Sequence, residues 1–269
     1  MSLLARRVAA LTGVAEDRIQ RLAGGDLSEV LALRRHDGRA LVAKGGPAIA
    51  AEAAMLRALA SAGVPVPAVE AEHEGVLLLD FIPNDRLFSP AAWRDIGAKL
   101  RALHARTGES YGWPVDYRLG SVELDNRESG DWRSFWARQR LVATARLLDR
   151  PWRERIDRLA ERIGEWLPQG PRPSLLHGDL WTGNILVEEG RLAALVDPAC
   201  YFGDREVDLA MLHLFDTPPE EFAEAYGPLE PGWEHRRAVY QLFPALVHLR
   251  LFGASYAPTV ERLLAALGA

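Results

Sequence analysis

The chain has 269 residues, of which 48% are hydrophobic and 26% are charged, and its formal net charge is −5 at pH 7. This is the balance of an ordinary globular protein, and the length allows one large domain or two lobes. Because general electrostatic binding of nucleic acid needs a basic surface, an acidic chain makes a nucleic-acid partner unfavourable. We therefore expect none.

The chain has a single cysteine, Cys200, which excludes an intramolecular disulfide. The N-terminal segment has two arginines within a short apolar run, so it lacks the apolar core of a signal peptide. No apolar run approaches the length of a membrane span. We expect a cytoplasmic protein with no membrane partner, and the oligomeric state is left open.

The first eighty residues predict short strands and one helix. Two segments of strand-like composition, 28–35 and 39–44, flank a turn sequence typical of a β-hairpin. The Ala- and Leu-rich segment 47–63 predicts a helix that ends at a glycine. The apolar run 75–83 has the length of a buried strand and stops at a proline.

Beyond Pro83 the pattern is mainly helical. Segment 89–107 predicts a helix with Ser89 as its N-cap, and 131–148 and 151–167 predict two more. The helices are interrupted by two short apolar runs that the turn Glu-Glu-Gly separates.

The order of these elements predicts an α+β fold with two lobes. The N-terminal lobe would comprise residues 1–82, small and rich in strands, and would bind nucleotide. The C-terminal lobe, residues 83–269, would be larger, mainly helical and carry the catalytic and substrate-binding groups. A cleft between two lobes is a common place for a ligand site.

The stretch LLHGDLWTGNILV, residues 175–187, places polar side chains between two apolar runs. Asn184 follows Asp179 by five residues, and Asp197 comes after the next short strand. If the two strands pair antiparallel, Asn184 and Asp197 meet at one end of the hairpin. A carboxylate and a side-chain amide form the hard-oxygen site that Mg²⁺ prefers. Asp179 would then orient or deprotonate an attacking hydroxyl.

This spacing is the layout of a kinase catalytic loop, in which H-x-D is followed by an asparagine and then by a metal-binding aspartate. Here the loop runs from His177 to Asn184. A polar β-turn followed by a capped loop is the structural alternative. The ordered set of four residues between strands favours the catalytic loop.

The predicted nucleotide clamp begins at Lys44, which ends the second strand of the N-terminal hairpin, where kinases keep a phosphate-contacting lysine. The chain has only two lysines among 32 basic residues, so a lysine here indicates a requirement for a compact charge. Glu52, in the next helix, is its natural partner. The alternatives are a solvated strand end and a solvated helix face.

Two further nucleotide contacts are predicted from position. Segment 23–30, AGGDLSEV, would turn over the phosphates, with its backbone amides and Ser28 as donors, although a plain tight turn would have the same sequence. The backbone around Asp80, Phe81 and Ile82 would bind adenine at the junction of the lobes.

The loop LLHGDLWTGN, followed by VDPACYFGDREVDLAM, resembles the fructosamine kinase family, within the wider group of aminoglycoside and choline kinases. The wider group shares H-G-D-x-x-x-x-N and a later aspartate. The narrower family is indicated by Leu180, Trp181 and Gly183 inside the loop, and the lobe order and length agree over nearly the whole chain.

The resemblance implies an ATP- and Mg²⁺-dependent small-molecule kinase with a protein-kinase-like fold. Its catalytic base would be Asp179, and Mg²⁺ would be held by Asn184 and Asp197. Lys44 would contact phosphate and pair with Glu52. Asp208 matches an aspartate that braces the catalytic loop, and His177 would order the same loop. Trp181 would line the sugar site or belong to the core.

The acceptor that the resemblance implies is a ketoamine, such as a fructosamine or ribulosamine, phosphorylated on a sugar hydroxyl. The segment 206–234 offers an independent hint, since it has eight carboxylates and no Lys or Arg. A negative field there would favour a cationic sugar-amine. A solvated acidic helix face is the alternative, and the hint does not separate a ketoamine from an aminoglycoside.

Two other functions are alternatives to ketoamine phosphorylation. One is an aminoglycoside- or choline-type phosphotransferase. The other is a catalytically inactive kinase fold that serves as a binding protein. The intact set of Lys44, Asp179, Asn184 and Asp197 favours an enzyme over the inactive fold.

Overall fold

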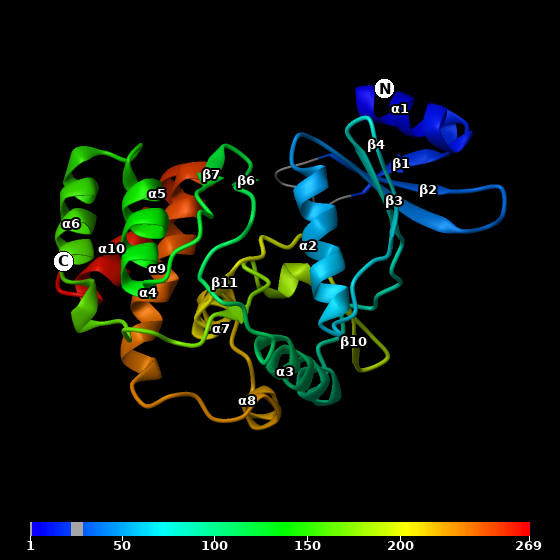
Figure 1. Ribbon diagram of the computed structural model, residues 1–269. Coiled ribbons are helices and arrows are strands. Elements are labelled where there is room, and N and C mark those ends of the chain that lie inside the picture. The colour runs from blue at the N-terminus through cyan, green and yellow to red at the C-terminus, as the bar shows by residue number, and fades with distance from the viewer. Residues whose placement is uncertain (1, 23–28) are drawn as a thin grey trace.

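The computed structural model describes residues 2–22 and 29–269 (Figure 1). Ser28, the predicted phosphate donor, lies outside the described residues. The elements of the N-terminal part are α1 (Leu3–Thr12), η1 (Glu16–Arg18), β1 (Ile19–Arg21), β2 (Val30–Arg34), β3 (Ala40–Gly45), α2 (Ile49–Ser61), β4 (Val69–His73) and β5 (Val76–Asp80). The five strands form one antiparallel sheet in the order β1-β2-β3-β5-β4.

The sheet is buried on both faces, which explains why β5 reads as a continuous apolar run. Alternate residues of a strand point to opposite faces. Val76 and Leu78 pack with α1 on one face, whereas Leu77 and Leu79 pack with α2 on the other. The predicted hairpin, helix and buried strand are confirmed, and α1, β1 and β4 are additional elements.

Helix α2 belongs to two hydrophobic cores. Ile49, Ala53 and Leu56 pack on the sheet, whereas Met55 and Leu59 belong to the large core of the C-terminal part. Figure 1 shows α2 between the sheet and the helical part. The helix that carries Glu52 is therefore held from both sides.

The C-terminal part is mainly helical. Its elements up to the catalytic loop are α3 (Pro90–His104), β6 (Tyr117–Leu119), β7 (Val122–Leu124), α4 (Trp132–Phe135), the π-helix η2 (Trp136–Val142), α5 (Ala143–Ala145), α6 (Arg150–Glu161), η3 (Ile163–Glu165) and β8 (Ser174–Leu175). The later elements are η4 (Thr182–Asn184), β9 (Ile185–Glu188), β10 (Arg191–Leu195), β11 (Phe202–Gly203), α7 (Glu206–Phe215), α8 (Glu220–Tyr226), α9 (Trp233–Phe252), η5 (Gly253–Tyr256) and α10 (Ala257–Ala266).

The predicted start of α3 and the β9–β10 hairpin are confirmed, whereas the predicted helix 151–167 is α6 followed by the 3-10 turn η3. The hydroxyl of Ser89 accepts from the N–H of Ala92 at 3.2 Å, so it caps α3 as expected. The predicted helix 131–148 is in fact two short α-helical pieces around the π-helix η2. Within residues 2–22 and 29–269, no helix has both the length and the apolar character needed to cross a membrane.

Together these features give the predicted α+β class, with a five-stranded sheet ahead of a helical part. The lobe boundary between residues 82 and 83 stays a prediction.

Candidate active site

The β9–β10 hairpin brings Asn184 and Asp197 to the same end. Ile185 pairs with Leu195, and the N–H of Val196 donates to the carbonyl of Asn184 at 3.0 Å. Asp197 follows directly and has φ 55°, a left-handed conformation that is uncommon for a residue with a side chain. The pairing of β9 with β10 thus brings the two predicted metal ligands to the same end of the hairpin.

Asp208 holds the start of the catalytic loop from beneath. Its carboxylate is 1% exposed and accepts from the N–H of His177 at 2.7 Å and from the N–H of Gly178 at 2.9 Å. His104 Nε2 donates to the same carboxylate at 3.1 Å. Burial alone would raise the pKa of Asp208, but the hydrogen bond and charge of His104 outweigh it, so the pKa is lowered.

His177 orders the loop as a neutral imidazole. Its Nε2 lies 3.0 Å from the carbonyl of Val196, which can only accept, so Nε2 carries the proton. Its Nδ1 accepts from the N–H of Asp179 at 3.3 Å. Burial lowers the pKa of His177, in agreement with this tautomer. The ring therefore ties the loop to the end of β10.

Gly178 is required by a close approach in the same turn. Its φ is +83°, and a Cβ added there would lie 2.0 Å from the carbonyl oxygen of Ala199. Only glycine fits both the left-handed backbone and this contact. The Gly between His and Asp in the motif thus has a steric cause.

Asp179 is a half-buried carboxylate whose pKa is shifted toward 7. Asn184 Nδ2 donates to its Oδ2 at 3.0 Å and to its backbone oxygen at 2.8 Å. Burial raises the pKa of Asp179 to about 7, with the charges of Asp197 and Asp208 adding to the rise and the bond from Asn184 opposing it. A carboxylate with a pKa near 7 is matched to general-base work at neutral pH.

Lys44 joins the two parts of the protein at this site. Its Nζ lies 2.5 Å from Glu52 Oε1 and 2.5 Å from Asp197 Oδ1. Lys44 and Glu52 are both buried, whereas the side chain of Asp197 is 47% exposed. Burial lowers the pKa of Lys44, but the charges of Asp197 and Glu52 outweigh it, and the ammonium form is favoured. The predicted Lys44–Glu52 pair is present.

The oxygens of Asn184 and Asp197 suit a hard divalent cation. The amide nitrogen of Asn184 donates both of its hydrogen bonds to Asp179. Its Oδ1 has no hydrogen-bond partner among the described residues. Asp197 Oδ2 likewise accepts no hydrogen bond within residues 2–22 and 29–269. One carboxylate and one amide fit Mg²⁺, which takes its remaining ligands from water and phosphate.

The predicted adenine segment follows β5. The N–H of Asp80 donates to Ala68 and that of Phe81 to Ala40, so both are used within the sheet. The N–H of Ile82 has no partner among the residues that the structure describes. Of the three predicted backbone donors, Ile82 is the one free to bind a base.

Trp181 lies at the surface of the loop with 38% of its side chain exposed. Its ring packs over Gly183, where a Cβ would lie 2.2 Å from the indole, and its centroid is 6.1 Å from that of Phe215. The next residue, Thr182, donates from its hydroxyl to Asp216 at 2.7 Å and from its N–H at 3.0 Å. The loop thus presents one face of the indole outward.

The acidic segment 206–234 is largely occupied by internal contacts. Glu206 is buried and pairs with Arg236, Asp208 braces the loop, and Asp216 holds Thr182. Glu221 and Glu234 also lie close to arginines. This favours a structural reading of the segment over a field that attracts a cation.

Three contributing residues were missed from the sequence: His104, Asp216 and Tyr117. His104 lies at the end of a helix more than a hundred residues from Asp208. Tyr117 is on β6, and burial together with the charges of Glu52, Asp197 and Asp179 raises its pKa. None has a local sequence signal.

The fold is that of several solved small-molecule phosphotransferases. Solved aminoglycoside and macrolide phosphotransferases share the fold at less than 25% identity. The aminoglycoside phosphotransferase, for example, superposes with a TM-score of 0.67 at 18% identity. This likeness shows the fold alone.

The model of the fructosamine kinase family matches residues 3–268, so the chain belongs to that family. A protein of Thermus thermophilus assigned as a probable ketoamine kinase is 36% identical over 254 residues, which are 91% of this chain and 92% of that protein. A probable ketoamine kinase of Enterococcus faecium is 38% identical over 64% of this chain and 65% of its own length.

A crystal structure from Thermobifida fusca, assigned as a fructosamine-3-kinase, superposes with a TM-score of 0.87. It is 31% identical, and the match covers 98% of each chain. The family is one of kinases, so the predicted class of enzyme is confirmed as an ATP-dependent phosphotransferase.

Proposed function

We propose that this protein uses Mg²⁺ and ATP to phosphorylate a sugar hydroxyl of a ketoamine, with Asp179 as the base. The observation that carries the proposal is the half-buried Asp179 carboxylate. It has a pKa of about 7 and a hydrogen bond from Asn184, and it lies near the Asp197–Lys44 pair. The relatives assigned as ketoamine kinases support the choice of acceptor.

The chemistry asked of the chain is mainly positioning and charge neutralisation. Asp179 would accept a hydrogen bond from the acceptor hydroxyl and align it with the γ-phosphate. It would take the hydroxyl proton as the new O–P bond forms and the bond from the γ-phosphorus to the β,γ-bridging oxygen breaks, so that ADP leaves. Lys44, oriented by Glu52, would hold phosphate oxygens. Mg²⁺, when bound by Asn184 and Asp197, would neutralise charge on the phosphates.

The remaining groups would bind and orient the two substrates. The N–H of Ile82 would bind adenine in the N-terminal lobe, residues 1–82. Trp181, in the C-terminal lobe, residues 83–269, would place one face of its indole against the sugar. The acceptor would be a cationic sugar-amine, and the cytoplasm is the expected location.

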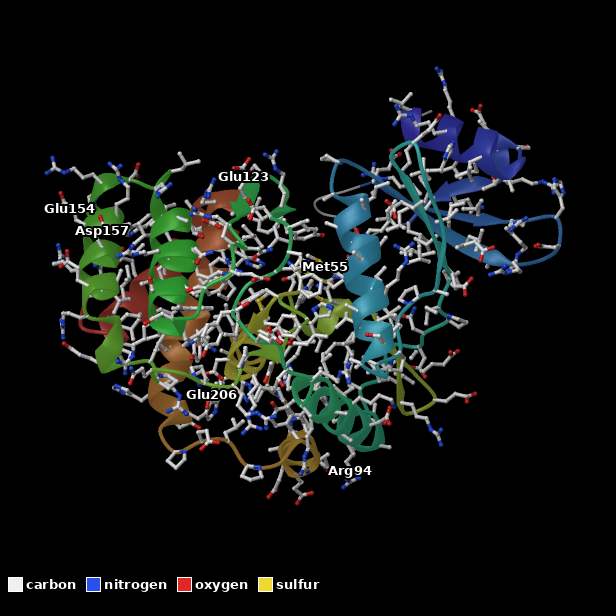
Figure 2. All side chains as sticks on the ribbon, viewed as in Figure 1. Met55, Arg94, Glu123, Glu154, Asp157 and Glu206 are labelled. Carbon is white, nitrogen blue, oxygen red and sulfur yellow. The ribbon has the colours of Figure 1, made fainter. Side chains whose placement is uncertain are left out.

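The test is ATP-dependent phosphoryl transfer to a panel of a fructosamine, a ribulosamine, an aminoglycoside and choline. We expect transfer to the ketoamines, and we expect Asp179→Asn to lower kcat by at least about a hundredfold, the scale of general-base catalysis. Asp157→Asn is the matched control, because Asp157 is exposed on α6 at the far side of the helical part (Figure 2).

Other outcomes assign other functions. Turnover of the aminoglycoside or of choline, without turnover of the ketoamines, would show that the acceptor is not a ketoamine. Binding of Mg²⁺·ATP without transfer to any acceptor, and with no effect of Asp179→Asn, would identify a kinase-fold binding protein instead of an enzyme.

A further inference from the structure

A second feature of the molecule is a large cleft with a volume of about 1320 Å³, which reaches Ala51 next to Glu52 on α2. One wall is the start of α2 with the residues before it, 47–51. The opposite walls are the β6–β7 hairpin, the helical segment 138–147 and Arg250 of α9. Figure 1 shows the hairpin between α2 and the helices α5 and α9, and Figure 2 marks it at Glu123.

Tyr117 connects this cleft to the catalytic centre. It lines the cleft from β6 and is half-buried against the large core. Ala51 of α2 also lines the cleft and directly precedes Glu52, whose carboxylate pairs with Lys44. Burial, together with the charges of Glu52, Asp197 and Asp179, raises the pKa of Tyr117. A molecule whose reacting hydroxyl is at Asp179 can therefore extend past Tyr117 into the cleft.

The three carboxylates that line the cleft each bind a neighbouring group of the protein. Asp116 accepts from the N–H of Asn126 at 2.8 Å. Glu123 pairs with Arg118 across the hairpin. Asp125 binds the guanidinium of Arg127 at 2.7 Å.

Three arginines of the cleft have no such partner. Arg138, Arg146 and Arg250 line it, and none donates a hydrogen bond or forms an ion pair with any residue in 2–22 or 29–269. Arg250 is half-buried, which lowers its pKa, and the charge of Glu123 only partly offsets this. Arginine remains charged under such conditions, so the cleft keeps an uncompensated positive charge.

The local helix geometry brings these groups to one wall. Arg138 and Arg146 are eight residues apart with Val142 midway, and all three line the cleft. Spacings of four keep side chains on one face of a helix. The π-helix η2 runs through this stretch, and such insertions occur often at functional sites. Leu147, 77% exposed at the same wall, adds an apolar contact.

We infer that this cleft binds a carboxylate at the amine end of the acceptor, through Arg138, Arg146 and Arg250. The inference rests on the proposed function, since the sugar end must face Asp179 and only the amine part can reach the cleft. Guanidinium groups match the planar carboxylate with paired hydrogen bonds. Val142 and Leu147 would contact the carbon chain that separates amine from carboxylate.

The experiment compares acceptors that differ only in this charge. Ketoamines of fructose with glycine, β-alanine and longer ω-amino acids are each assayed as the free acid and as the carboxamide. We expect the wild-type kcat/KM for the acid to exceed that for the amide by about tenfold at the best chain length, the scale of one charge-assisted hydrogen bond.

The acid-to-amide ratio should fall toward one in the variant with Arg138→Gln, Arg146→Gln and Arg250→Gln. The exposed single variants Arg138→Gln and Arg146→Gln should each lower it in part. The control combines Arg153→Gln and Arg158→Gln, exposed on α6 and outside the cleft, and should keep the wild-type ratio. Equal use of acid and amide by the wild type at every chain length would overturn the inference.

Failure of the proposed function gives a different result, which is no turnover of either form. The cleft is then tested without catalysis, by calorimetric titration with inorganic sulfate. Weaker sulfate binding by the cleft variant than by the α6 control supports an anion site. Equal binding by the two variants refutes it.

Discussion

Replacement of Asp208 by asparagine tests how much its hydrogen bonds to the loop contribute to the free energy of unfolding. The carboxylate accepts hydrogen bonds at 2.7, 2.9 and 3.1 Å while it is 1% exposed. The amide keeps one oxygen but places an N–H₂ group against a backbone N–H. Loss of the charge and one buried unsatisfied donor together cost about 3 to 5 kcal/mol.

The assay is urea unfolding at pH 7, with Asp157→Asn as the surface control, for which we expect a change within about 0.5 kcal/mol. The pKa of Asp208 is lowered in the folded protein, so its contribution is present above the unfolded pKa and is lost as the pH falls. The difference between wild type and Asp208→Asn should therefore narrow below about pH 4.

The same variant should lose activity at pH 7 even where it is folded, because the N–H groups of His177 and Gly178 fix the backbone that leads to Asp179. A destabilisation below about 1 kcal/mol at pH 7, or a difference that does not depend on pH, would refute this account of the loop.

Two further predictions concern the same loop. Because the pKa of Asp179 is raised to about 7 and the base must be ionised, kcat/KM should fall as the pH drops through 7, and a profile flat down to pH 5 would contradict the assignment. Gly178→Ala should cost more than about 2 kcal/mol in thermal or urea unfolding, because its Cβ would meet Ala199 in a left-handed backbone; an alanine variant of wild-type stability would show that the turn can open.

The local parts of the site could be predicted from the sequence. His177, Asp179 and Asn184 lie within one short loop, and the pairing of two strands fixes where Asp197 comes. Lys44 could be placed because a hairpin and a helix follow from nearby residues.

The missed parts depend on contacts between distant segments. His104 meets Asp208 across 104 positions, and Tyr117 reaches the site from a three-residue strand. The π-helix also has no local sequence signal. Its buried Arg140 contacts Asn126 and the rings of Phe135 and Tyr201, which belong to other parts of the chain or to the preceding helix. Such tertiary contacts override the local pattern.

The double burial of α2 also bears on how the molecule can be divided and how it moves. A chain cut after residue 82 would leave Met55 and Leu59 exposed to water, since they belong to the core of the other part. The predicted lobe boundary at residue 82 therefore does not coincide with the division between the hydrophobic cores. A rigid separation of the two parts would have to break the packing of α2 on one side or the other.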